Sequence, residues 1–407
     1  MWELIRANKR KSFYLFIGMG VILLFLGYFF GLSLIGEEGG VLGVIAAIII
    51  WIVLSLVSYF SGSSILLSIS NAKEVRPDVH PQLFNVVEEM KIASNLPKMP
   101  KVYIINEEAP NAFATGRDPQ NSAIAVTAGL LSQMNRDELQ GVVAHEMSHI
   151  MNRDILFMTF SGIMMGSIIM LSNIFLRGMW ISGGSSLGRY SNRSSKNSGG
   201  LIAIISILLA IFGPIAAQFL YFAISRKREY LADASSARLT RYPEGLASAL
   251  EKLSENRFTL HGANKANAGL FIVNPLKKKG MKLKNLSSTH PPISERVRIL
   301  RSMNSGANYS DYQKAYSSVK QESGNVIPRS ALVNKEQIGI RESVTSESAS
   351  IPKVNQKRSL GDLVMKVNKY SFLICECGLK LKGPPEYRGK EVTCPRCGKR
   401  LTFSTEN

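Results

Sequence analysis

The sequence predicts an α-helical membrane protein with about four transmembrane helices, a mainly α, α+β domain outside the membrane and a small cysteine-rich unit. Three observations lead to this prediction. Four uncharged apolar runs are each long enough to cross a hydrocarbon core of roughly 30 Å, which takes about 20 helical residues; they are residues 13–35, 41–72, 155–176 and 197–225. Helix-like and strand-like patterns alternate between the second and third runs. All four cysteines follow residue 361.

Basic residues precede the first run, as they would in a signal peptide. The run is longer than a signal-peptide core of about 7–15 residues, and no small-x-small cleavage site closes it, so we expect a retained anchor. The chain has 49 Lys plus Arg against 30 Asp plus Glu, a net charge of +19.

The distribution of this charge predicts the orientation in the membrane. Basic residues flank the runs at positions 6–11, 73–76 and 226–228, whereas the short loop 36–40 is acidic. By the positive-inside rule, the N-terminus and both parts of the soluble domain are expected in the cytoplasm, in a multi-pass protein of the cell inner (cytoplasmic) membrane. The basic Gly/Ser-rich loop 178–200 does not fit this orientation, so the third and fourth runs could instead form a re-entrant or peripheral hairpin.

The soluble domain begins with a helix after Pro81, because apolar residues recur at helical spacing up to about residue 93. Residues 101–105 and 123–127 predict strands, with 111–116 extended between them. Asn135 and Glu138 form a capping box for a helix that we expect to continue unbroken into the third run. Further helices are expected over residues 226–256 and about 292–303.

The predicted units follow one another along the chain. They are a transmembrane hairpin (1–72), the first part of the soluble domain (73–154), a second transmembrane hairpin (155–225), the second part of the domain (226–303), a polar, flexible linker (304–360) and the cysteine-rich unit (361–407).

The helix that starts at Asn135 carries His145, Glu146 and His149 in an H-E-x-x-H pattern. Histidines at i and i+4 share one face of a helix, so both imidazoles can reach one metal ion, and Glu146 can deprotonate a metal-bound water. The alternative is an ordinary amphipathic helix with two partly exposed histidines, which could carry the same five-residue pattern without binding a metal ion. The chain has only five histidines, so two at ligand spacing point to a metal site.

A catalytic zinc ion usually has three protein ligands and one position for water. Glu229 could supply the third ligand, and Asp233 could accept a hydrogen bond from the other ring nitrogen of a ligating histidine. Both could instead be solvated carboxylates of a charged helix. Because two antiparallel spans return the chain to the same side of the membrane, we expect Glu229 at the height of His149.

These motifs resemble those of the HtpX-type membrane zinc metalloproteases, gluzincins related to the CAAX prenyl-protein processing proteases. The resemblance covers about residues 1–303, and its motifs stand in family order at 111–116, 143–150 with Asn152 and Asp154, 229–233 and 288–296. It implies a zincin-like catalytic domain with zinc ligands at His145, His149 and Glu229 and with Glu146 as the catalytic base. In that chemistry zinc would activate a water, and Glu146 would carry its proton to the leaving amine.

Two further parts of the resemblance concern substrate. The stretch 111–116 resembles the edge strand of the family, so an extended substrate is expected to pair with Asn111, Ala112, Phe113 and Ala114; a simple loop is the alternative. His290 could act as an oxyanion donor or a reversible extra ligand, or it could only brace the turn before its helix.

The cysteine-rich unit has two pairs, Cys375 with Cys377 and Cys394 with Cys397, each followed by glycine. Four thiolates in this spacing suit a structural zinc ion in a zinc ribbon, and a cytoplasmic location disfavours the alternative of disulfides. The resemblance does not cover this unit, which could bind substrate, a protein partner or nucleic acid, or only fold.

We therefore predict a zinc endopeptidase embedded in the lipid bilayer, with one catalytic and one structural zinc ion. Its predicted substrates are misfolded or damaged membrane proteins, cut on the cytosolic side, and unfolded polypeptides. The quality-control and stress-response role is implied by the resemblance alone. The alternatives are a dedicated processing protease with few substrates and an inactive scaffold that presents the ribbon. The lysines of residues 277–284 could contact anionic head groups or form a solvated loop, and without interleaved aromatic residues they do not favour nucleic-acid binding.

Overall fold

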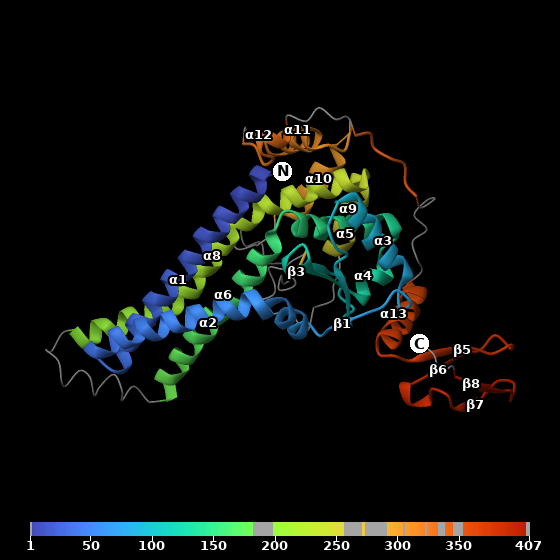
Figure 1. Cartoon of the computed structure of the whole chain (residues 1–407), viewed down its shortest axis with the longest axis horizontal. Helices are drawn as coiled ribbons and strands as arrows, with labels where there is room; N and C mark the ends of the chain where they lie inside the picture. The colour runs from blue at the N-terminus through green and yellow to red at the C-terminus, as the bar shows by residue number, and fades with distance from the viewer. Residues whose placement is uncertain are drawn as a thin grey trace.

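The structure is a computed structural model that describes residues 2–181, 198–255, 271–272, 291–303, 306–321, 324–332, 338–344 and 353–403. Its long helices project from one side of a domain built from a small sheet and shorter helices (Figure 1). Four helical segments are long and apolar enough to cross a membrane, namely Phe16–Leu34, Glu37–Ile69, Asp154–Gly178 and Gly200–Phe219. They coincide with the four predicted runs, which confirms the predicted fold class.

The first two membrane helices, α1 (Trp2–Leu34) and α2 (Glu37–Ile69), form a tightly packed hairpin. Glycines make this packing possible, because a Cβ atom on Gly31 would lie 1.9 Å from the carbonyl oxygen of Gly39. Small residues of this kind let two helix backbones approach closely. The other two membrane helices, α6 (Asp154–Ile181) and α8 (Ser198–Thr240), pack against each other and against this hairpin.

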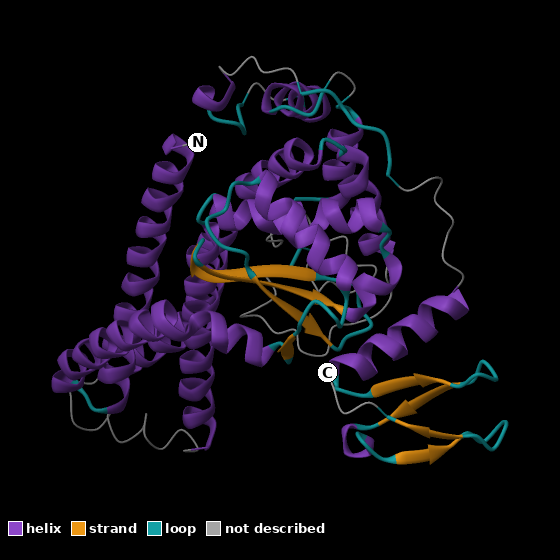
Figure 2. Ribbon diagram, turned by 45° about the vertical axis from the view of Figure 1, so that its right-hand side comes forward, coloured by secondary structure: helices purple, strands orange, loops and turns teal. Residues whose placement is uncertain are grey.

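The domain contains a four-stranded sheet in the order β1-β2-β4-β3 (Figure 2). Its strands are β1 (Ala72–Glu74), β2 (Lys101–Ile105), β3 (Ala112–Asp118) and β4 (Asn121–Thr127). β2 and β4 are parallel and the other pairs are antiparallel, so β3 lies at one edge of the sheet. The predicted strands at 101–105 and 123–127 are confirmed as β2 and β4, and the stretch predicted to be extended between them contains most of β3.

Helix α5 (Arg136–Met151) runs through the centre of the domain. The other short helices here are α3 (Pro81–Ala93), α4 (Ala128–Gln133), α9 (Pro243–Glu255) and α10 (Ile293–Arg301). The predicted capping box starts α5: the Asn135 side chain accepts a hydrogen bond from the Glu138 backbone N–H, and the Glu138 carboxylate accepts one from the Asn135 N–H, both at 2.9 Å. Most of α5 is buried between α3, α8 and α9.

The prediction that this helix continues unbroken into the third membrane span is wrong. α5 ends at Met151 and α6 begins at Asp154. Between them Arg153 has a φ of 58°, the left-handed conformation that ends a helix and that residues other than glycine adopt at a cost. Arginine gives no sequence signal for such a turn. Past the fourth span, by contrast, α8 continues without a break to Thr240.

Beyond α10 the chain forms α11 (Tyr309–Lys320), α12 (Arg329–Leu332) and α13 (Lys353–Val367). The segment predicted as a linker therefore contributes structure of its own, because Tyr312 of α11 is fully buried and Arg341 forms a 2.7 Å ion pair with Asp137 at the start of α5. Two hairpins follow, β5 (Ser371–Ile374) with β6 (Lys380–Gly383), and, after a 3-10 turn (Pro385–Tyr387), β7 (Glu391–Thr393) with β8 (Arg400–Thr402).

Candidate metal centre and catalytic site

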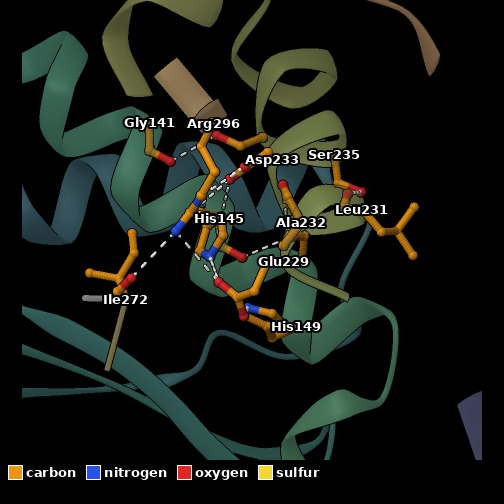
Figure 3. Close-up of polar contacts among 12 residues, drawn as sticks. Gly141, His145, His149, Glu229, Leu231, Ala232, Asp233, Ser235, Ile272 and Arg296 are labelled. Atoms are coloured by element: carbon orange, nitrogen blue, oxygen red, sulfur yellow. Dashed lines mark hydrogen bonds and ion pairs between the residues drawn. The ribbon is translucent and has the colours of Figure 1, made fainter. Parts of the chain in front are cut away.

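Helices α5 and α8 bring three predicted metal ligands together in the interior of the domain (Figure 3). His145 and His149 lie one turn apart on α5, and Glu229 lies on the part of α8 beyond the fourth span. The Nε2 atoms of His145 and His149 are each 3.6 Å from a carboxylate oxygen of Glu229. All three side chains are buried, and one ligand atom from each lies within 4.8 Å of the others.

This arrangement fits a zinc ion. Zinc–nitrogen and zinc–oxygen bonds of about 2.0–2.1 Å in tetrahedral geometry place neighbouring ligand atoms about 3.4 Å apart, close to the distances between these side chains. The His145 Nε2 atom is buried and has no hydrogen-bond partner among the described residues. A buried polar atom without a partner costs about 1–3 kcal/mol, and a cation at this position would remove that cost.

Carboxylates hold the other nitrogen of each imidazole. Asp233 Oδ1 lies 3.0 Å from His145 Nδ1, in the position that the sequence predicts for it, and Asp154 Oδ2 lies 3.4 Å from His149 Nδ1. A carboxylate on Nδ1 directs Nε2 toward the metal and makes the imidazole a stronger ligand. Asp154 belongs to the motif at residues 143–154, where its sequence position alone indicated no role. Its second oxygen lies 3.6 Å from Nε of Arg228, whose guanidinium stacks on the Phe157 ring at 3.7 Å.

Arg296 of α10 is a second residue of this site whose role was not predicted from the sequence. It is fully buried and donates two hydrogen bonds to Asp233, from Nε at 2.8 Å and from a terminal nitrogen at 2.7 Å. Its other terminal nitrogen lies 3.6 Å from the Glu229 carboxylate. The sequence did contain a pattern that could have indicated its burial. Arg296 stands at helical spacing from the apolar Ile299 and Leu300, so it lies on the buried face of α10.

The electrostatics of the pocket favour a positive charge at its centre. Burial by itself would lower the pKa of His145, but the neighbouring carboxylates of Asp233 and Glu229 outweigh it and raise that pKa to about 9. For a carboxyl group burial acts in the other direction, and it raises the pKa of Glu146. Burial would also raise the pKa of Asp233, but the positive charge of Arg296 holds that pKa below its usual value. The same carboxylates that stabilise a proton on His145 would stabilise a divalent cation in its place.

The edge strand β3 faces this pocket. The Ala114 backbone N–H donates a hydrogen bond to the Glu146 carboxylate, and the Oε2 atom of Glu146 is buried without a hydrogen-bond partner in the described part of the chain. Next to it, the Ala112 carbonyl accepts a hydrogen bond from the Ile272 N–H at 3.0 Å. A polypeptide that pairs with β3 at Ala112 would therefore have to displace Ile272.

The other two predicted substrate-binding residues are placed differently. The Asn111 side chain accepts a hydrogen bond from the Ala112 N–H at 3.0 Å, and the buried Phe113 ring packs edge-on against Phe271 at 5.2 Å. Their side chains thus support β3. His290 lies outside the described residues, as do residues 277–284 and 182–197.

The four cysteines form a second cluster at the ends of the two hairpins. The Cys375 and Cys397 sulfurs are 3.4 Å apart, and those of Cys377 and Cys394 are 3.7 Å apart. Zinc–sulfur bonds of about 2.3 Å place tetrahedral neighbours about 3.8 Å apart, so this cluster also fits a zinc ion. Gly378 and Gly398 have φ values of 81° and 73°, which explains the glycine that follows each pair.

Two comparisons of the sequence with known proteins indicate the same family. A family model described as peptidase family M48 matches residues 77–304. Curated relatives described as protease HtpX homologs include those of Dictyoglomus turgidum, 43% identical over 303 residues, and Streptococcus uberis, 40% identical over 310 residues. These matches cover 74% of this chain and 94% and 100% of the two relatives. Among solved structures, Ste24p of S. mikatae aligns at 20% identity with a TM-score of 0.39, covering 74% of this chain and 67% of that one.

Proposed function

The chain belongs to peptidase family M48 and is a membrane zinc metalloprotease, and on that premise we propose that it cleaves misfolded or damaged membrane proteins in their cytosolic segments. His145, His149 and Glu229 hold the catalytic zinc ion, and Glu146 is the general base. The observation that carries this assignment is the convergence of the three buried side chains from α5 and α8 on one point, with Glu146 beside them.

The residues around that point have separable roles. A bound zinc ion supplies a Lewis acid that activates water and stabilises negative charge on the oxygen of the scissile carbonyl. Glu146 accepts the proton of the attacking water and returns it to the leaving amine, because Ala114 holds one carboxylate oxygen while Oε2 has no hydrogen-bond partner among the described residues. Asp233 and Asp154 orient the imidazoles, and Arg296 orients Asp233.

The β3 edge supports a preference for unfolded polypeptide. An extended substrate that adds to a sheet edge is bound mainly through its backbone, so the edge contributes little sequence preference. β3 faces Glu146, and a strand paired with it would lie next to the metal ligands. Segments that have lost their native structure can adopt this extended form, whereas folded helices cannot.

The position of the site relative to the membrane helices supports cleavage close to the bilayer. Glu229 lies four residues beyond residue 225, where the fourth apolar run ends, on the same helix. At about 1.5 Å per helical residue it stands about 6 Å beyond that run. Together with the basic flanks of the spans, this favours a catalytic domain on the cytosolic face of the inner membrane.

Zinc content tests the two metal sites separately. Detergent-purified wild-type protein is expected to contain two zinc ions per chain. The His145→Ala/His149→Ala and Cys394→Ser/Cys397→Ser variants should each contain one, and only the cysteine variant should still cleave casein. One zinc ion in both the wild type and the histidine variant would mean that the ribbon alone binds metal, and it would favour an inactive scaffold.

Glu229→Ala is expected to lose the catalytic zinc ion and to keep the ribbon zinc, because two histidines alone leave the site one ligand short. The measurement is zinc per chain after dialysis, with Glu244→Ala, an exposed carboxylate on α9, as the matched control. Normal zinc content in the Glu229 variant would contradict the ligand assignment.

The range of substrates is tested with the wild-type enzyme on a panel of unfolded proteins. Cleavage of one sequence in the panel and no others would favour a dedicated processing protease.

A further inference from the structure

A cavity of about 1260 Å³ lies where the membrane helices meet the catalytic domain. Its walls come from α1, α2 and α6, from the loop after α3, from the turn between β3 and β4, and from the end of α8. None of the three metal ligands lines it, so it is distinct from the catalytic site. Its volume is large enough for a sizeable small molecule or a lipid chain.

One wall of the cavity is apolar and aromatic. It is formed by side chains of the three membrane helices, namely Phe13, Phe16, Leu56, Tyr59, Phe157 and Phe160. Phe16 begins the first candidate span, and Phe157 stands three residues into the third. Aromatic rings at this height are typical of the boundary between the hydrocarbon core and the head groups.

Charged side chains also line the cavity, and among the described residues they are Arg117, Arg153, Arg238 and one carboxylate, Asp118. The Arg117 guanidinium lies over the Tyr59 ring of the aromatic wall, 5.8 Å from its centroid. Arg117 contacts Asp118 at 3.4 Å, and Asp118 is also bound by Asn121. Arg238 lies over the ring of Tyr309. Arg153, in the left-handed turn between α5 and α6, is exposed and forms no ion pair within the described ranges.

We propose that this cavity binds an anionic phospholipid of the surrounding bilayer, with its phosphate at Arg117 and Arg153 and an acyl chain along the aromatic wall. Lining arginines in excess over carboxylates, together with an apolar aromatic wall, match the head group and the acyl chain of such a lipid. Guanidinium groups bind phosphate through charge-assisted hydrogen bonds, and basic pockets beside membrane helices bind anionic head groups. A small soluble anion would leave the aromatic wall uncovered. A zwitterionic lipid would leave the net positive charge of the lining arginines uncompensated.

Native mass spectrometry of the detergent-purified full chain tests this site with phosphatidylglycerol and phosphatidylcholine of identical acyl chains. We expect one tightly bound phosphatidylglycerol per chain, preferred at least fivefold over phosphatidylcholine. Arg117→Gln/Arg153→Gln should weaken phosphatidylglycerol binding at least fivefold and leave phosphatidylcholine binding unchanged. The matched control Arg76→Gln/Arg358→Gln removes the same charge from exposed residues outside the cavity and should bind like the wild type.

A second variant tests the apolar wall. Ser55→Trp places an indole in the cavity from α2 and should weaken binding of both lipids, since it occupies the space of the acyl chain. A thermal melt would show whether the arginine variant folds. If it does not fold, Ser55→Trp tests the proposal in its place, and unchanged lipid binding by Ser55→Trp would contradict it. The proposal is overturned if the arginine variant binds phosphatidylglycerol like its control or if the two lipids bind equally. Displacement of the lipid by equimolar inorganic phosphate would also overturn it, because the ligand would then be a soluble anion.

Discussion

Glu146→Gln is expected to reduce peptide-bond hydrolysis by about 10²–10⁴-fold while zinc content stays at the wild-type value. Loss of a general base has an effect of this size, because the amide cannot accept the proton of the attacking water. The fold should be unaffected, because glutamine has nearly the same volume and its carbonyl oxygen can still accept the hydrogen bond of the Ala114 N–H. The measurement is the initial rate of casein cleavage by detergent-purified protein.

The matched control is Glu88→Gln, an exposed carboxylate on α3, which should cleave at the wild-type rate. Zinc analysis and a thermal melt of the Glu146 variant separate loss of the base from loss of the metal or of the fold. A Glu146→Gln enzyme that retains its zinc and more than a tenth of its activity would remove Glu146 from the mechanism.

Arg296→Met is expected to lower the free energy of unfolding by about 3–5 kcal/mol, the cost of leaving a buried charge without its partner. Asp233 would lose both hydrogen bonds from the guanidinium, and Glu229 would lose its nearby cation. For a domain of this size the change corresponds to a fall in melting temperature of about 10 °C. The melt is recorded in the presence of a chelator, so that a difference in metal binding does not contribute.

Two comparisons make this result specific to the buried pair. Arg298→Met, an exposed arginine on the same helix, should melt like the wild type. Arg296→Met/Asp233→Asn should recover at least half of the lost stability, because the neutral amide needs no counter-charge and can still accept a hydrogen bond from His145 Nδ1. If the double variant loses the sum of the two single effects, Arg296 stabilises the domain through packing and not through Asp233.

The parts of the fold that the sequence predicted correctly depend on neighbours along the chain. Four apolar runs of sufficient length become four long helices, and the capping box of Asn135 and Glu138 starts α5 as expected. His145 and His149 lie on one face because four residues make about one helical turn. The same reasoning places Asp233 one turn after Glu229, where it reaches the Nδ1 atom of His145.

The parts of the fold and of the site that the sequence did not predict depend on packing between distant segments. Arg296, Asp154 and Ile272 take their positions from the way α10, the α5–α6 turn and the segment beside β3 meet around α5. The turn at Arg153 separates α5 from α6, and it contains no glycine or proline from which the sequence would have predicted it. Likewise, the ion pair of Arg341 with Asp137 attaches to α5 a segment whose composition resembles that of a linker.

The sequence by itself therefore determined the membrane class, the chemistry of the ligands and their spacing within each helix, because hydropathy and helical period act over a few residues. The tertiary structure alone decided which buried charges face one another across different elements. A carboxylate such as Asp233 can be buried only where a partner such as Arg296 is brought to it, and that partner comes from a helix far away in the chain.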